Sequence, residues 1–131
     1  MIKWKIKYVD YNGEEQEEDF YFNLNKAEVM EMNLNANGAY GEYLQRIVDQ
    51  RDGKKIAEAF KDLILKSYGE KSPDGRRFIK SDAATEAFMQ TEAYSELYME
   101  LATSPGAAEK FVAGVLPKVE QNPVPEQMRL A

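Results

Sequence analysis

The stretch IKWKIKYVDYNGEEQEEDFYF (residues 2–22) decides the fold. Apolar or aromatic residues alternate with lysine as far as Tyr8, and a period of two is typical of a half-buried strand. The centre of the stretch, DYNG, has Asp10 first and Gly13 last, an order that suits a type I turn closed by a glycine bulge. The stretch therefore predicts an antiparallel hairpin with a three-residue loop, in which Asp10 pairs with Glu14.

Hydrophobic and charge pairing fix the expected register of this hairpin. The three-residue loop sets Ile2 opposite Phe22, Trp4 opposite Phe20, Lys5 opposite Asp19 and Lys7 opposite Glu17. A two-residue loop would put Ile6 opposite Asp19, because a slip by one residue turns every side chain to the other face. We therefore expect the bulged register. The acidic run at residues 14–19 is then the solvated partner of the lysines, at about 0.2–1 kcal/mol for each cross-strand pair.

Helical spacing and capping residues follow the hairpin. A capping box at Asn25 and Glu28 opens a short helix, and Gly69 is expected to end a later one as its C-terminal cap. The remaining expected helices run from Tyr40 to near Asp52-Gly53, from about Ile56 to Tyr68, and onward from Ser81, Thr91 and Ser104-Pro105, with Pro117 ending the last. The fold class is α+β: an N-terminal antiparallel β-hairpin packed on a bundle of five to six α-helices.

The expected domain organisation is simple. With 131 residues, the chain has the size of one domain with a real core. We assign residues 1–117 to that single α+β domain. Residues 118–131 have little apolar periodicity, and we expect them to form a flexible C-terminal tail.

The composition disfavours several classes of protein. There is no cysteine and no histidine, so serine–histidine and cysteine–histidine catalysis cannot be assembled within the chain, and thiolate metal sites are excluded. A net charge of −6 disfavours binding to a nucleic-acid backbone. No apolar run reaches the roughly 20 residues of a membrane span, so a cytoplasmic location is expected. In the calcium-loop pattern counted from Asp10, the sixth and twelfth places hold Glu15 and Tyr21, which do not fit. We predict no catalytic, metal or cofactor site.

The stretch GEKSPDGRRFIKSD (residues 69–82) is the strongest candidate for an anion-binding loop. It has cations after a glycine, as does DGKK at residues 52–55, but neither has the glycine spacing of a P-loop. We interpret it as a connector with a turn at residues 72–75, a short extended piece at residues 77–80, and a helix opened by Ser81. Its cations, Arg76, Arg77 and Lys80, are expected to meet carboxylates of the chain or of a partner.

The tyrosines carry the best signal for partner binding. There are eight, and a tyrosine on an apolar helix face is usually a core residue with its hydroxyl at the rim. Tyrosine is also enriched at interface hot spots. We therefore keep both interpretations open for two candidate partner-binding faces: Tyr40 with Tyr43, and Tyr94, Leu97, Tyr98 and Leu101 on the helix over residues 92–103.

Five segments together resemble a known family. They are EDFYFNLNKAEVMEM, EYLQRIVDQRDGKKI, LILKSYGEKSPDGRRFIKSD, QTEAYSELYMELAT and AEKFVAGVLP. In this order, over about residues 2–117, they resemble the tail assembly chaperones of long-tailed bacteriophages. The resemblance implies a non-enzymatic protein of the host cytoplasm. Such a protein holds the helical tape measure protein soluble while tail tube subunits polymerise around it, and it is absent from the mature virion.

Two other classes remain open beside this resemblance. One is an acidic phage-encoded inhibitor of a host defence or nucleic-acid-binding protein, which would imitate a phosphate backbone with rows of carboxylates. The other is a structural virion protein at the head–tail joint. In each case the expected partners are proteins, without a nucleic acid or a membrane, and a homo-oligomer is compatible with the sequence.

Overall fold

A computed structural model describes residues 1–35 and 40–117, so the expected tail at 118–131 lies outside the described residues. The elements are, in order, β1 (Ile2–Val9), β2 (Glu15–Phe22), α1 (Lys26–Asn35), α2 (Tyr40–Asp49), α3 (Gly53–Ser67), β3 (Tyr68–Lys71), β4 (Phe78–Ile79), α4 (Asp82–Met89), α5 (Glu92–Thr103) and α6 (Pro105–Val115). The α+β class, with an N-terminal hairpin and six described helices, is confirmed.

The N-terminal hairpin has the expected bulged register. The backbone N–H of Asp10 donates to the carbonyl of Glu14 at 2.9 Å, that of Gly13 donates to the carbonyl of Asp10 at 3.0 Å, and Gly13 has a φ of 81°. Ile2 lies opposite Phe22, Trp4 opposite Phe20, Lys5 opposite Asp19 and Lys7 opposite Glu17. The lysines share two carboxylates: Lys5 and Lys7 both approach Glu17, at 3.3 and 3.6 Å, while Lys3 lies 3.9 Å from Asp19.

The sheet is larger than expected, because β3 and β4 extend it to four strands in the order β1-β2-β3-β4. The assignment of Gly69 as a helix C-cap is therefore wrong. The chain leaves α3 directly into β3, where Gly69 pairs with Tyr21. A Cβ at position 69 would lie 2.5 Å from the ring of Phe78. The glycine is thus needed for the close approach of β4, and not for a left-handed backbone.

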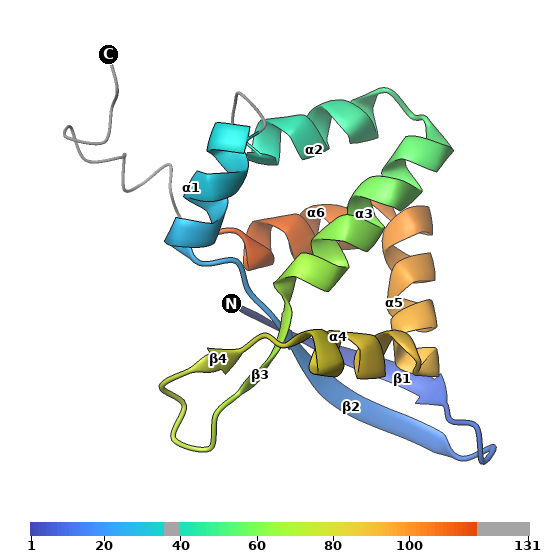
Figure 1. The fold of residues 1–131 in the computed structure, drawn as a ribbon. Coiled ribbons are helices and arrows are strands. Elements are labelled where there is room, and N and C mark those ends of the chain that lie inside the picture. The colour runs from blue at the N-terminus through green and yellow to red at the C-terminus, as the bar shows by residue number, and fades with distance from the viewer. Residues whose placement is uncertain (36–39, 118–131) are drawn as a thin grey trace.

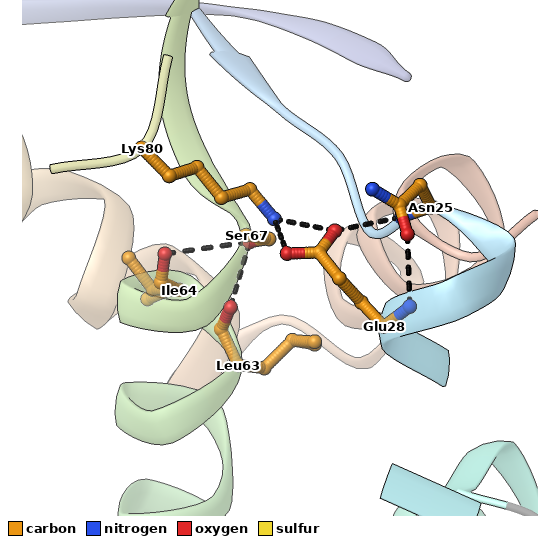
Figure 2. Close-up of polar contacts among 6 residues, drawn as sticks. All are labelled: Asn25, Glu28, Leu63, Ile64, Ser67 and Lys80. Carbon is orange, nitrogen blue, oxygen red and sulfur yellow. Dashed lines mark hydrogen bonds and ion pairs between the residues drawn. The ribbon is translucent and has the colours of Figure 1, made fainter. Parts of the chain in front are cut away.

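The helix starts follow the expected caps, with one correction. Asn25 and Glu28 form the capping box, with bonds of 2.9 and 2.8 Å (Figure 2). Side chains of Ser81, Thr91 and Ser104 cap α4, α5 and α6. The second helix was expected to stop near Asp52-Gly53, but α2 already ends at Asp49. Asp52 is instead the N-cap of the next helix, since its side chain accepts hydrogen bonds from the backbone N–H groups of Lys54 and Lys55. Gly53 is therefore the first residue of α3.

The core lies between the apolar face of the hairpin and the helices. Figure 1 shows α3, α5 and α6 on one side of the β1–β2 hairpin, and the β3–β4 hairpin projecting at the opposite end from the β1–β2 turn. Fully buried Phe22 contacts the rings of Tyr68, Phe88 and Phe111, and Tyr68 stacks on Phe88 with ring centroids 4.3 Å apart. These aromatic contacts join the sheet to α4 and α6.

Candidate partner-binding surface

Helix α5 holds four of the six residues that the sequence predicts as a partner-binding face. The hydroxyl of Thr91 caps its first turn, accepting from the backbone N–H of Tyr94 at 3.3 Å. Leu97 and Leu101 are 1 and 2% exposed, and both belong to the buried cluster. In this structure the two leucines are therefore core residues that fix α5 against the rest of the molecule, and Leu97 is reached only from the hollow described below.

Tyr94 and Tyr98 lie at the rim of the same core. Both are half-buried, their ring centroids are 6.0 Å apart, and the ring of Tyr94 meets Phe88 edge-on at 5.8 Å. Burial raises the pKa of the Tyr94 hydroxyl. The neighbouring Met99 is 54% exposed. Met99 directly follows Tyr98 and so lies off the stripe of the two tyrosines. Helix α5 thus presents half-buried tyrosine rings and, round the helix from them, an adaptable methionine, residue types that suit contact with another protein.

The second predicted face is on α2. Leu44 and Ile47 are buried, whereas Tyr43 is 41% exposed. The backbone of Tyr40 begins α2, but its side chain lies outside the described part of the structure. Helices α2 and α5 both pack on α3. The two predicted tyrosine faces are therefore on two different helices, each of which contacts α3.

A line of glutamates on α5 was not recognised from the sequence. Trp4 Nε1 donates to the Glu100 carboxylate at 2.9 Å, and the Tyr11 hydroxyl donates to Glu92 at 2.8 Å. Because Trp4 precedes Tyr11 on the hairpin, α5 runs antiparallel to β1. Glu92, Glu96 and Glu100 are spaced by four, which places them on one side of a helix. The spacing of the three glutamates is visible in the sequence, but the packing of β1 beside them is not.

A hollow adjoins the middle of β1 on this side of α5. Its volume is about 360 Å³, and its lining residues are Lys5, Ile6, Lys7, Glu96, Leu97 and Glu100. Ile6 and Leu97 are buried apolar residues, and the others are exposed and charged. The hollow therefore has an apolar floor and charged walls of both signs.

Hydrogen bonds within two turns lower the pKa of two carboxylates, and the lysines of β1 lower the pKa of a third, Glu17. The amide of Gln16 and the backbone N–H of Glu14 bind the Asp10 carboxylate and lower its pKa. The Ser72 hydroxyl and the backbone N–H of Arg76 lower the pKa of Asp74 in the same way. Among residues 1–35 and 40–117, no three acidic side chains are grouped so that they could hold a metal ion. The hydrogen bonds that Asp10 and Asp74 accept from neighbouring backbone N–H groups stabilise these turns.

The four cations of the 69–82 stretch have different surroundings. Lys71 lies over the ring of Tyr21, with its ammonium group 4.7 Å from the ring centroid. Lys80 forms an ion pair with Glu28, as expected for a cation that meets the chain's own carboxylate. Arg76 and Arg77 are exposed, and neither has an ion-pair partner among the residues that the structure describes. Their hairpin is held by Ser72, whose buried hydroxyl donates to Asp74 at 2.6 Å and accepts from the N–H of Arg77 at 3.0 Å. The interpretation of Ser72 to Gly75 as a turn is confirmed.

In the described part of the chain, no helix has the length and apolar character that crossing a membrane requires. The chain has no match among curated proteins or among solved structures. One family model does match, over residues 1–128, and its description is phage tail assembly chaperone.

Proposed function

Because this chain belongs to the phage tail assembly chaperone family, we propose that it binds the tape measure protein, and tail tube subunits with it, while the tail is assembled in the host cytoplasm. The observation that carries this proposal is the family match, which leaves only three of the 131 residues unmatched. Membership places the chain in tail assembly, and the family resemblance of the sequence implies the helical tape measure protein as the client.

The tyrosine surface of α5 is the proposed contact for this client. We define it as Tyr94, Tyr98 and Met99. An amphipathic client helix needs an apolar or aromatic surface that lies within a charged surround. Half-buried tyrosines provide such a surface at low cost in side-chain entropy. On α2, Tyr43 and its predicted companion Tyr40 are the proposed second contact, with Leu97 and Leu101 supporting the α5 surface from beneath.

The proposed role is non-catalytic. The chain contains no histidine and no cysteine. The carboxylates with lowered pKa have structural explanations, since Asp10 and Asp74 are bound within turns and Glu17 is bound by Lys5 and Lys7. The same β2 carboxylates that would be needed for acidic mimicry lie opposite lysines of β1. These observations support protein binding over catalysis, and they support a chaperone over an imitation of a phosphate backbone.

Copurification tests the proposed surface. The chain is tagged and co-expressed with the tape measure protein of the same phage, and the amount of client recovered is measured for Tyr94→Ala, Tyr98→Ala and the double variant. We expect the double variant to lose most of the client while it stays folded, with a lowered melting temperature because both rings pack on the core, and we expect Tyr98→Phe to retain the client. Tyr21→Ala is the matched control, because Tyr21 is also a half-buried tyrosine but lies on β2, where its ring contacts Lys71.

The possible outcomes test the α5 surface and the proposed function separately. If wild type recovers the client and the folded double variant recovers the same amount, the α5 surface is not the contact. If wild type itself recovers none, the proposed function fails. Mass spectrometry of purified virions addresses the structural alternative: we propose that the chain is absent from them, and stoichiometric recovery would identify it as a virion component instead.

A further inference from the structure

Strand β1 has an open edge. It is the first strand of the β1-β2-β3-β4 sheet, it is eight residues long, and within the described residues its only strand neighbour is β2. The hydrogen bond from Asp10 to Glu14 fixes the phase of the ladder. Hydrogen-bonded pairs alternate with non-bonded pairs in an antiparallel ladder. The residues at even positions of β1 therefore bond to β2, while Lys3, Lys5, Lys7 and Val9 direct their backbone N–H and C=O groups to the open edge.

The space beside this edge is also defined. The 360 Å³ hollow adjoins Lys5, Ile6 and Lys7, and Glu96 and Glu100 of α5 bound its far side. A strand added to β1 would place alternate side chains beside the lysines and the remaining ones beside Ile6, toward α5. Buried Ile6 and Leu97 favour apolar residues there, and the α5 glutamates disfavour carboxylates.

We propose that the open edge of β1 binds an extended segment of a partner polypeptide in which carboxylates alternate with apolar residues. The inference deepens the proposed function, on which it rests for the existence of a protein client. Strand β2 already shows this chemistry on the other edge, since Glu17 and Asp19 lie against the lysines. A carboxylate-bearing strand on the open edge would lie along the other side of the same row of lysines, so each lysine would have a carboxylate on either side of it.

The same lysines argue against a second copy as the occupant. Antiparallel pairing of two β1 edges would bring lysines opposite lysines, and like charges directly opposite one another destabilise a sheet. Lysines on edge strands are a common means of preventing such self-pairing. The row of lysines therefore selects against the chain itself and in favour of an acidic partner strand.

Peptide binding tests the inference with the full chain and without the client. The probes are two capped ten-residue peptides, one alternating glutamate with valine and the other alternating lysine with valine, and titration calorimetry measures their dissociation constants. We expect the glutamate peptide to bind at least about tenfold more tightly, because opposite charges face across the added pair. Equal binding of the two peptides, or no binding of the glutamate peptide, would overturn the inference.

Two variants at one position separate the backbone contact from the charge. Lys5→Pro removes an N–H that points to the open edge and leaves the β1–β2 ladder intact, which is the setting in which strands accept proline. Lys5→Thr removes the charge and keeps the N–H. We expect Lys5→Pro to weaken binding of the glutamate peptide about tenfold, and Lys5→Thr to weaken it less. Wild-type binding by a folded Lys5→Pro chain would overturn the inference.

Two further measurements keep the test decisive if Lys5→Pro does not fold. A glutamate peptide N-methylated at alternate residues cannot donate to β1, so its loss of binding supports the inference and retained binding overturns it. Hydrogen exchange of the free chain must show the Lys5 and Lys7 amides unprotected, since protection would mean that the edge is already occupied by the chain itself. Failure of the peptide assay alone rejects the strand site, whereas failure of client copurification rejects the proposed function.

Discussion

The ammonium group of Lys80 binds both carboxylate oxygens of Glu28, at 2.8 and 2.7 Å, across 52 residues of sequence. The same carboxylate accepts the backbone N–H of Asn25 at 2.9 Å, and so it also closes the capping box of α1 (Figure 2). One side chain therefore caps the first helix and joins it to the chain that leaves β4. This contact holds the β3–β4 hairpin to the helical part of the molecule.

Removal of the Glu28 charge is expected to destabilise the fold. The two side chains are only 22 and 32% exposed, so Glu28→Gln should lower the free energy of unfolding by about 1–3 kcal/mol. Chemical denaturation measures this change. The control is Asp62→Asn, which breaks the half-exposed Lys66–Asp62 pair on α3 and should cost no more than about 0.5 kcal/mol. Equal losses in the two variants would show that Glu28 has no special structural role.

Two glycines of α6 are expected to respond oppositely to alanine. A Cβ at Gly114 would lie 2.4 Å from Ile2 Cδ1 and 2.9 Å from its Cβ, whereas a Cβ at Gly106 meets nothing within 4 Å. Gly114→Ala should therefore destabilise the fold by about 1–3 kcal/mol through overpacking, despite the higher helix propensity of alanine. Gly106→Ala should be neutral or slightly stabilising. Thermal unfolding that ranks the variants the other way would contradict this packing of β1 on α6.

Substitutions at buried and at exposed positions of α5 are expected to change the free energy of unfolding by different amounts. Leu97→Ala should lower the free energy of unfolding by about 2–5 kcal/mol, because it empties a fully buried position. Met99→Ala, at a 54% exposed position, should change it by no more than about 0.5 kcal/mol. Denaturant titration checks both. A small effect of Leu97→Ala would contradict the assignment of this side chain to the core.

The β1–β2 hairpin is expected to lose stability in alkali. A hydrogen bond from the Tyr8 hydroxyl to the Glu18 carboxylate, together with the nearby negative charge, raises the pKa of Tyr8 to about 12, whereas the ordinary value is near 10. A raised pKa means that the folded chain holds this proton more tightly. The contribution is complete below about pH 10 and is lost as the pH rises toward 12.

The comparison with Tyr8→Phe isolates this effect from the titration of other groups. Unfolding is followed for both proteins between pH 9 and 12, and wild type should lose more stability than Tyr8→Phe across the upper part of that range. Glu18→Gln, which keeps a hydrogen-bond acceptor without the charge, should resemble Tyr8→Phe. Parallel curves for wild type and Tyr8→Phe would show that the Tyr8 proton is not held by the fold.

Local patterns predicted the first hairpin and most helix starts, but they could not predict the second hairpin. The register of β1 and β2 depends on DYNG and on neighbouring charges, all within a few residues. Strand β3 is different, since Tyr68 continues the helical spacing of α3 and becomes a strand residue only because it pairs with distant Phe22. Gly69 was misassigned for the same reason: the ring that requires the glycine belongs to Phe78.

The candidate surface shows a second limit of sequence patterns. A stripe of Tyr94, Leu97, Tyr98 and Leu101 has the same spacing whether it faces a core or a partner. Only the packed structure shows that the leucines are buried and that the tyrosines remain at the rim. The open edge of β1 is likewise a property of the whole sheet, because strand order cannot be read from the alternation of Lys5, Ile6 and Lys7.

The soluble fraction of the tape measure protein is the most direct test of the central claim that this chain is its assembly chaperone. The client is expressed in bacteria with and without the chain at matched levels, and it is quantified in the supernatant and the pellet. The account predicts that the client is largely insoluble alone and becomes soluble, in a complex with the chain, when both are present. An equally insoluble client in both cultures, with no complex recovered, would contradict it.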